Sequence, residues 1–273
     1  MSLIEVMIPC FNYGRFLRQC VRSVLDQPGV NLRVVILDDA STDETPAVAA
    51  ELAAEDRRVT VDRAPRNRGH IATYNHAIAR ARGDYLLLLS ADDFLLPGAL
   101  GRAVRVLDRA PGLSMVFGGF ITYADGDPVP DTAAEPARPV LTTPHTFVEK
   151  LSRGNKIATA TVVVRTLAQQ GLGPYRANLP HAADLEMWLR FTVNTRIAYI
   201  RARQAAYRRH DANMSLGYSR LEDADECICA FGPHLVAISR MPDGGRMVSR
   251  IHDRLKTRWQ ALKAEADTAA DAA

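Results

Sequence analysis

The first third of the chain alternates between two hydrophobic periods. Four short runs rich in Val, Ile and Leu have the composition of parallel strands that are covered on both faces, and they span residues 3–8, 32–37, 59–61 and 85–89. Between these runs, apolar residues recur at helical spacing in segments near 16–25, 45–54 and 71–81. This alternation predicts an α/β fold, in which a mostly parallel sheet is flanked by helices and joined by right-handed crossovers.

The pattern changes after residue 93. It predicts helices at 97–107, from 144 onwards and at 185–193, and strands at 115–123, 161–164 and 197–200. Residues 125–139 are rich in Pro, Asp and Ala, and we expect a loop or a poorly ordered insertion there. From about residue 221 the chain is predicted to be helical, with a disordered tail beyond residue 264. We therefore expect a main domain at 1–215 and a C-terminal helical extension with a disordered tail at 216–273.

Composition excludes several classes of protein. The formal net charge of +3 is mild and no segment alternates basic and aromatic residues, so nucleic acid is not expected as a partner. No apolar run approaches the roughly 20 residues that span a bilayer. The four cysteines, at positions 10, 20, 227 and 229, lack the spacing of a zinc site. Because no secretory signal precedes them, we expect reduced thiols and a cytoplasmic protein.

Two pairs of acidic residues follow predicted strands. Asp38 and Asp39 come directly after one run, and Asp92 and Asp93 follow another after a Ser-Ala spacer. In open α/β sheets, ligands bind beyond the carboxyl ends of the strands. Adjacent carboxylates there suit a hard divalent ion, Mg²⁺ or Mn²⁺, which often shares its oxygen ligands with substrate phosphates. A solvated turn also explains either pair taken alone.

The signatures of several other enzyme classes are missing from the sequence. It contains no G-x-x-x-x-G-K-[ST] and no G-x-G-x-x-G after the first predicted strand, which argues against a P-loop enzyme and a dinucleotide oxidoreductase. It also contains no G-x-S-x-G and no H-E-x-x-H, the signatures of common hydrolases.

Five motifs, in the same order, resemble those of the family 2 glycosyltransferases with a GT-A fold. They are I-P-C-F-N at 8–12, L-D-D-A-S-T-D at 37–43, N-R-G through Asn at 67–75, A-R-G-D-Y at 81–85 and S-A-D-D at 90–93. The similarity covers about three quarters of the chain and implies that residues 1–215 are a catalytic domain. Ser90 departs from the pattern, because many relatives carry Asp there, and this leaves the metal preference open.

The resemblance implies how the base of a nucleotide diphosphate-sugar is bound. Pro9, Phe11 and Asn12 belong to the first motif, and Phe11 is expected to stack on the nucleobase. Asp39 is expected to accept a hydrogen bond from the base. Taken alone, Phe11 is more typical of a core residue, and the order of the motifs favours the binding role.

Further motif residues are assigned to the same donor. Asn67 and Gly69 would border the base pocket, although they are also typical of a plain turn. Asp92 would reach the ribose, and Asp93 would bind the metal that bridges the diphosphate.

The second half supplies the remaining candidates. Residues 181–190, H-A-A-D-L-E-M-W-L-R, resemble the segment that carries the family's general base, which corresponds to Asp184, although Ala183 stands where relatives often have Glu. A catalytic carboxylate fits this chemistry, because the acceptor hydroxyl must lose its proton as it attacks. An Asp of ordinary pKa near a helix N-terminus would be ionised at neutral pH, and the same Asp is also typical of a helix cap.

Residues 207–215 resemble the family's Y-R-x-H-x-x-[NS]-x-S loop. The resemblance implies that His210 is a metal ligand or a diphosphate contact and that Arg208 neutralises phosphate, for which a guanidinium is well suited. Glu186 is a secondary candidate for an acceptor contact. Trp188 is typical of a core residue and also suits the floor of an acceptor pocket.

An apolar stripe marks the C-terminal segment. It consists of Met247, Val248, Ile251, Leu255, Trp259 and Leu262, and Arg and Lys residues flank it. Three alternatives stay open for this stripe: packing on the catalytic domain, pairing with a second subunit as a homodimer, or peripheral contact with the inner membrane face.

We therefore expect an inverting, metal-dependent glycosyltransferase whose partners are a nucleotide diphosphate-sugar donor and a carbohydrate or other hydroxyl-bearing acceptor. Two alternatives are a nucleotidyltransferase of similar sheet architecture, for which a Gly-rich basic loop is missing, and a catalytically silent module that binds nucleotide-sugar. The sequence leaves the donor sugar, the nucleobase and the acceptor open.

Overall fold

The computed structural model describes residues 1–271 and divides into two compact units. Unit 1 comprises residues 1–141, 157–174 and 196–209, and unit 2 comprises residues 142–156, 175–195 and 210–273. These units do not follow the predicted boundary after residue 215, because two segments of the main domain, 142–156 and 175–195, group with the C-terminal helices. The assignment of functional domains stays a prediction.

Unit 1 is built on a mixed sheet, which has nine strands within the described residues and the order β3-β2-β1-β4-β8-β6-β9-β5, with β7 paired to β9. The strands are β1 (Leu3–Cys10), β2 (Asn31–Asp38), β3 (Val59–Arg63), β4 (Tyr85–Leu88), β5 (Phe94–Leu95), β6 (Met115–Tyr123), β7 (Pro139–Thr142), β8 (Val163–Arg165) and β9 (Ile197–Arg208). The first four pair in parallel, as the sequence predicts, whereas β8 runs antiparallel to both β4 and β6. The carboxyl ends of β1 to β4 therefore lie at one edge.

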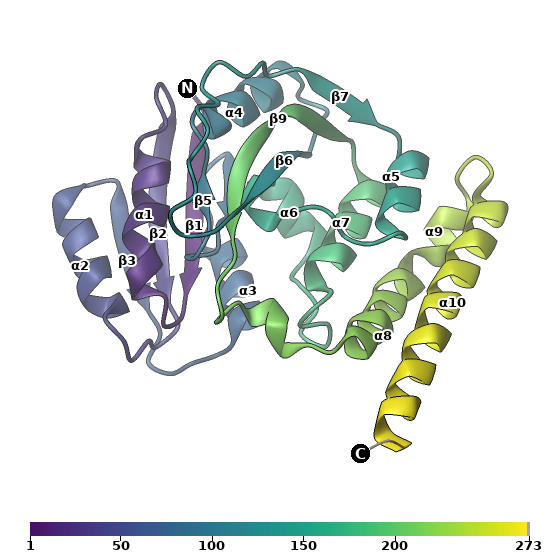
Figure 1. Ribbon diagram of the computed structural model, residues 1–273. Coiled ribbons are helices and arrows are strands. Elements are labelled where there is room, and N and C mark those ends of the chain that lie inside the picture. Colours follow the sequence, from purple (N-terminus) through teal and green to yellow (C-terminus); the bar gives the residue numbers. More distant parts are fainter. Residues whose placement is uncertain (272–273) are drawn as a thin grey trace. The chain divides into compact units, whose positions relative to one another are not determined.

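Helices cover both faces of the parallel strands. They are α1 (Gly14–Leu25), α2 (Thr45–Glu55), α3 (His70–Arg80), α4 (Ala99–Arg109) and α6 (Thr166–Leu172), with a 3₁₀ turn η1 (Thr159–Thr161). α1 and α2 lie side by side (Figure 1), and α1 buries Phe16, Cys20 and Val24, which share one helical face. α3 joins β3 to β4 on the other side of β1, so a right-handed crossover puts it on the opposite face.

A bulge between β6 and β9 depends on glycine. The register of this parallel pair shifts at Gly118 and Gly119. A Cβ atom built on Gly118 would lie 2.9 Å from the carbonyl oxygen of Ala202 and would overlap the side chain of Gln204. Only glycine allows β9 to approach this closely, and the bulge carries the end of β9 to Arg208.

The loop at 125–139 is held by buried polar groups rather than being a poorly ordered insertion. The guanidinium of Arg102, which is 3% exposed, donates to the carbonyl oxygen of Thr132 at 2.7 Å and to the side chain of Gln204 at 2.7 Å. Glu135 pairs with Arg203 of β9 at 2.6 Å. The sequence showed the loop-forming residues, but the anchors lie far away along the chain.

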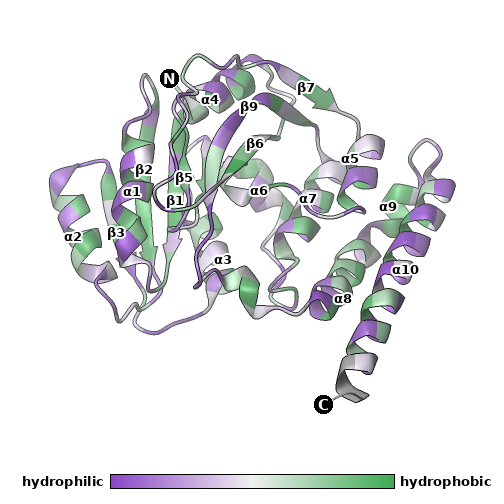
Figure 2. Cartoon of the chain, in the orientation of Figure 1, coloured by the Kyte–Doolittle hydropathy of each residue, from purple (hydrophilic) through white to green (hydrophobic). Residues whose placement is uncertain are grey.

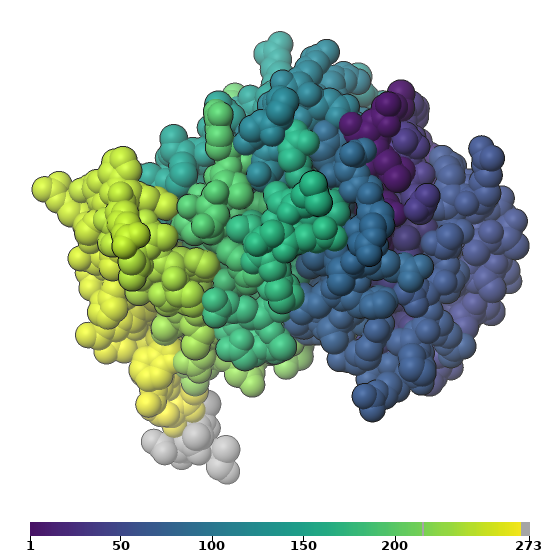
Figure 3. Space-filling model, turned by 180° about the vertical axis from the view of Figure 1, so that it is seen from behind, coloured from purple at the N-terminus to yellow at the C-terminus, as the bar shows by residue number. Residues whose placement is uncertain are grey.

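Unit 2 is helical within the described residues. Its elements are α5 (Pro144–Leu151), α7 (Ala183–Asn194), η2 (Met214–Gly217), α8 (Arg220–Phe231), η3 (Gly232–His234), α9 (Leu235–Ser239) and α10 (Gly244–Asp271). Phe191 of α7 and Phe231 of α8 are fully buried. The side chains of α8, α9 and α10 form a continuous surface in Figure 3.

The long helix α10 follows the predicted apolar stripe. Met247, Ile251, Leu255 and Leu262 are buried, and apolar and polar residues alternate along the helix in Figure 2. α10 contacts α5, α8 and α9, so the stripe packs within unit 2. The helix continues to Asp271 through most of the tail that we predicted to be disordered, because this segment is rich in the helix former Ala. Residues 272–273 lie outside the described residues. None of the helices described is long and apolar enough to cross a membrane.

Candidate active site

The loops after β1 and β2 are tied together at the carboxyl edge of the sheet. Asn12 has a positive φ of 56°, and its backbone N–H donates to the hydroxyl of Ser41 at 2.9 Å. The Asn12 side-chain oxygen accepts the N–H of Thr42 at 2.8 Å. Pro9 lies opposite Leu37 in the last part of β1, and Phe11 is 42% exposed beside Asn12. An exposed aromatic ring at this edge is available to stack on a flat ligand.

Asp39 organises the third loop of this edge. It is buried, and its carboxylate accepts the backbone N–H groups of Arg68 at 3.0 Å and Gly69 at 2.9 Å. The side-chain oxygen of Asn67 also accepts the Gly69 N–H, at 2.8 Å. Gly69 has φ of +83°, which strains any residue with a side chain. The structure thus brings Asp39, Asn67 and Gly69 together, while their contact with a base stays a prediction.

Asp92 and Asp93 form a tight turn after β4. The N–H of Asp93 donates to the carbonyl oxygen of Ser90 at 3.0 Å, and both acidic residues are buried. Burial, and then the charge of Asp92, raises the pKa of Asp93 well above its usual range. Because two adjacent carboxylates destabilise each other's charged forms, this turn favours an added cation. Burial, and after it the charge of Asp92, raises the pKa of Tyr13 above its usual range, and the charge of Asp93 adds a smaller effect. The motif that ends at Asn12 did not indicate this neighbour.

Arg208 clamps this acidic turn. Its backbone N–H donates to the Asp93 carboxylate at 3.0 Å, and its Nε donates to the Asp92 carbonyl oxygen at 2.9 Å. The guanidinium also bonds Asp125 and Gln19. It lies 4.7, 5.0 and 5.6 Å from three ring centroids, those of Phe16, Tyr123 and Phe94.

The expected role of Arg208 in neutralising phosphate stays a prediction. The residue is only 3% exposed, and its contacts hold the Asp92–Asp93 turn in place. The sequence motif carried no sign of this, because the three rings come from α1, β5 and β6.

His210 belongs to unit 2, on the loop after β9. Its N–H donates to the side-chain oxygen of Asn213 at 2.7 Å, its ring Nδ1 accepts the N–H of Ala212 at 3.2 Å, and its Nε2 lies 3.3 Å from the Asn213 amide. Both ring nitrogens therefore have neighbours within their own loop. In the described part of the chain, no group of three or more His, Cys, Asp or Glu side chains has the arrangement of a metal site. The role of His210 as a ligand stays a prediction.

Asp184 lies in the first turn of α7, as the sequence predicts. Its Oδ2 accepts the side-chain amide of Asn155 at 2.7 Å, and its Oδ1 accepts the N–H of Leu185 at 2.6 Å. Burial raises its pKa to about 6, although both hydrogen bonds and the charge of His181 lower it. The expectation of an ordinary pKa was therefore wrong, because desolvation outweighs the helix N-terminus. Asn155 comes from a loop that carried no sequence signal.

Two further candidates of α7 turn out to support the helix. Glu186 is fully buried, and its carboxylate bonds Arg190 and lies 3.2 Å from Arg176 and 2.9 Å from His234. These contacts of Glu186 with Arg176, Arg190 and His234 hold segments of unit 2 together, while a contact of Glu186 with an acceptor stays a prediction. Trp188 is 1% exposed and belongs to the core.

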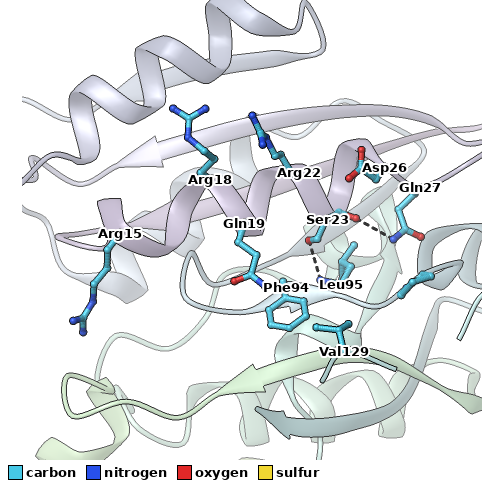
Figure 4. Close-up of a pocket in the computed structure, with 11 residues that line it drawn as sticks. Arg15, Arg18, Gln19, Arg22, Ser23, Asp26, Gln27, Phe94, Leu95 and Val129 are labelled. Atoms are coloured by element: carbon cyan, nitrogen blue, oxygen red, sulfur yellow. Dashed lines mark hydrogen bonds between the residues drawn. The ribbon is translucent and has the colours of Figure 1, made fainter. Parts of the chain in front are cut away.

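A separate cavity of about 590 Å³ opens beside α1 in unit 1 (Figure 4). Its lining includes Gln19, Phe94 and Val129 but, among the described residues, none of the predicted site residues. Arg18 and Arg22 also line it, yet they point away from Phe94 and pair with Glu51 and Glu55 of α2.

Residues 5–170 match the family model described as Glycosyl transferase family 2. The chain belongs to this family. An uncharacterized protein of Mycobacterium tuberculosis is 29% identical to this glycosyltransferase over 77% of the chain and 68% of that protein. The putative glycosyltransferase EpsE of Bacillus subtilis is 26% identical over 69% of the chain and 66% of that protein. The glycosyltransferase thus spans about two thirds of the length of these relatives.

Solved structures confirm the fold class. TarS of S. aureus, residues 1–349 in complex with UDP-GlcNAc, superposes with a TM-score of 0.71 at 18% identity, over 93% of this chain and 72% of that one. The mannosyltransferase PcManGT from Pyrobaculum calidifontis, in complex with GDP-Man and Mn²⁺, superposes with a TM-score of 0.63 at 16% identity, over 99% and 75%. The glycosyltransferase therefore has the GT-A fold that the five motifs implied.

Proposed function

We propose that this family 2 glycosyltransferase moves a sugar from a nucleotide diphosphate-sugar to an acceptor hydroxyl, with inversion at the anomeric carbon. One observation carries the proposal: the Asp39–Gly69 loop and the clamped Asp92–Asp93 turn follow parallel strands, so they share one edge of the sheet. A base-binding loop and an acidic turn at one edge suit the two ends of a nucleoside diphosphate. Complexes of TarS with UDP-GlcNAc and of PcManGT with GDP-Man support the substrate class.

In this proposal, the donor lies along the sheet edge from base to diphosphate. Phe11 stacks on the base, and Asp39, Asn67 and Gly69 border it beside Pro9 and Asn12. Asp92 contacts the ribose. Asp39 already accepts two backbone N–H groups, so a carboxylate oxygen that binds the base keeps its orientation through the loop.

The acidic turn fits a divalent cation. Asp92 and Asp93 offer hard oxygen ligands, and their mutual repulsion is relieved by a cation. We propose that Asp93, with His210 as a further ligand, holds Mn²⁺ or Mg²⁺. When bound, such an ion neutralises charge on the diphosphate and on the departing nucleoside diphosphate. Arg208 keeps the turn in shape for this role.

Asp184 is the proposed general base. With a pKa of about 6 it is ionised at neutral pH and takes up a proton more readily than an ordinary Asp. Asn155 fixes one oxygen and the Leu185 N–H fixes the other. The base removes the acceptor proton while the hydroxyl attacks the face opposite the leaving group, so a single displacement inverts the anomeric carbon.

A thermal-shift panel tests the donor class. UDP, GDP, UDP-GlcNAc and GDP-mannose are each added with and without Mn²⁺, because a ligand that binds the native state raises its stability by mass action. We expect one base to stabilise the protein selectively, and Mn²⁺ to increase the effect in the native protein but not in Asp93→Asn. Absence of stabilisation by every nucleotide would contradict the proposal. Release of pyrophosphate from a nucleoside triphosphate would favour a nucleotidyltransferase.

A further inference from the structure

His181 lies three residues before Asp184, at the start of the turn that leads into α7. Its ring Nε2 is 2.8 Å from the carboxylate of Asp223 on α8. The ring also packs on Tyr218, with centroids 4.4 Å apart and planes at 35°. The imidazole is therefore held at both its edge and its face.

The backbone beside His181 is fixed by the same helix. The N–H groups of His181 and Ala182 both donate to one carboxylate oxygen of Glu226, each at 2.8 Å. One turn of α8 thus holds the ring through Asp223 and the main chain through Glu226. The turn that precedes Asp184 is therefore held in place by α8.

Helix α10 extends this arrangement. Arg258 bonds the Asp223 carboxylate, and Trp259 donates its indole N–H to Asp225 at 2.6 Å. On the same helix, Arg250 lies 3.2 Å from Glu149 of α5, and α5 is followed by the loop that carries Asn155. His181 contacts α8, and Asn155 lies on the loop after α5, so two of the residues that act on Asp184 are next to helices that α10 contacts.

We propose that His181, held by Asp223 and through it by Arg258, is a positioning residue that keeps a positive charge beside Asp184. This inference rests on the proposed function of Asp184. It gives the C-terminal helices a task in the reaction, since α8 and α10 fix the charge that keeps the base ionised.

The carboxylates around His181 all favour its protonated form. The hydrogen bond to Asp223 is the largest cause that raises the pKa of His181. Burial lowers this pKa by less, and the charges of Asp223, Asp184 and Glu226 raise it further. His181 therefore carries a proton to higher pH than an ordinary His. In return, its charge lowers the pKa of Asp184, against the larger effect of burial.

The other titratable groups near this pair do not reverse that balance. Cys227 of α8 interacts with Asp184, and burial, with the charge of Asp223, raises its thiol pKa to about 12, so the thiol stays neutral. Glu222 interacts with His181 and is exposed. The pKa of Tyr218 is raised by burial, so its hydroxyl is neutral as well.

The test measures the charge state of Asp184 directly, without substrate. The full chain is labelled with isotope in the aspartate carboxyl carbons, and the Asp184 signal is assigned by its loss in Asp184→Asn. In the native protein we expect it to titrate near pH 6. In His181→Gln we expect an upward shift of about 0.5–1 pH unit, because a nearby positive charge is removed. Asp223→Asn removes the partner of the ring, so it should lower the pKa of His181 itself, which the ring signals of His181 report.

Arg220→Gln is a matched control. Arg220 also joins α8 to α10, through Glu265 at 3.1 Å, but its side chain is 78% exposed, so its loss should leave the titration unchanged. An unshifted Asp184 titration in His181→Gln would overturn the inference, as would an equal shift in Arg220→Gln. If His181→Gln fails to fold, His181→Phe, which keeps a ring packed on Tyr218 and carries no charge, decides.

Failure of the proposed function gives a different result. If Asp184→Asn retains near-normal turnover, Asp184 is not the base, whatever its titration shows. If Asp184→Asn is inactive and the titration is unshifted in the His181 variant, only the positioning role is lost.

Discussion

The side-chain amide of Asn155 donates to Asp184 Oδ2 at 2.7 Å, which leaves the proposed base with one oxygen fixed from a different segment of the chain. Both residues belong to unit 2, so the orientation of the carboxylate is set within one compact body. A base that is oriented before the substrate arrives needs little rearrangement during the reaction.

Turnover should fall on the acid side of neutrality. Burial raises the pKa of Asp184 to about 6, and only its ionised form accepts a proton from the acceptor. We therefore expect kcat to be half-maximal near pH 6 and to fall about tenfold per pH unit below that. The measurement is initial rate against pH at saturating donor. A rate that stays constant down to pH 4.5 would show that the base has an ordinary Asp pKa or lies elsewhere.

Asp184→Asn should gain relative stability as the pH rises. A carboxyl whose folded-state pKa is raised contributes stability below its unfolded pKa and loses it as the pH passes the folded value, here between about 4 and 6. The variant has no such loss, so its free energy of unfolding relative to the native protein should rise by roughly 1–2 kcal/mol between pH 4.5 and 8, after allowance for solvent screening. Chemical denaturation at the two pH values measures this, and a difference that is equal at both would contradict it.

Arg208→Lys should loosen the acidic turn. Lysine keeps the charge but cannot bond Asp92, Asp125 and Gln19 together or lie as a plane among three rings. We expect a loss of about 2–4 kcal/mol in unfolding free energy and weaker stabilisation by nucleotide with Mn²⁺. The control is Arg209→Lys at the exposed next position, which should change neither. Equal behaviour of the two variants would mean that Arg208 is no clamp.

Ala40→Gly should stabilise the protein. Ala40 has φ of +62°, where a Cβ costs roughly 1–2 kcal/mol, and glycine relieves this strain at some cost in unfolded-state entropy. The expected net gain is about 0.5–1 kcal/mol. Ala50→Gly, at an exposed position inside α2, should instead lose about 1 kcal/mol. Thermal unfolding of both variants checks the opposite signs, and a loss in both would show that the Ala40 backbone carries no strain.

The parallel half of the fold was predictable because its signals are local. Each run of Val, Ile and Leu in β1, β2 and β4 is bounded by helical periods and by turn residues, and the structure confirms them. The sequence also predicted a strand at 161–164, and the structure has β8 at Val163–Arg165, but the antiparallel place of β8 between β4 and β6 depends on distant partners. The loop at 125–139 was predicted, but its anchoring was not, because Arg102 holds it from α4.

In the candidate site, too, the features with local motifs were predictable and those set by distant packing were not. Asp39 and Gly69 were predicted to be neighbours from their motifs, and the structure joins them at 2.9 Å. The raised pKa of Asp184 was not predictable, because it arises from burial by residues far along the chain. Sequence motifs identify a charged residue, whereas its solvation is set only by the packed fold.

The measurement that tests the account most directly compares turnover and donor binding in Asp184→Asn. Nucleoside-diphosphate release and the anomeric configuration of the product are followed for the native protein and the variant, with the donor and Mn²⁺ at saturation. We predict that turnover falls by roughly two to four orders of magnitude while donor binding is unchanged, and that the native product is inverted. Near-normal turnover in Asp184→Asn, or a product that retains the donor configuration, would contradict the account.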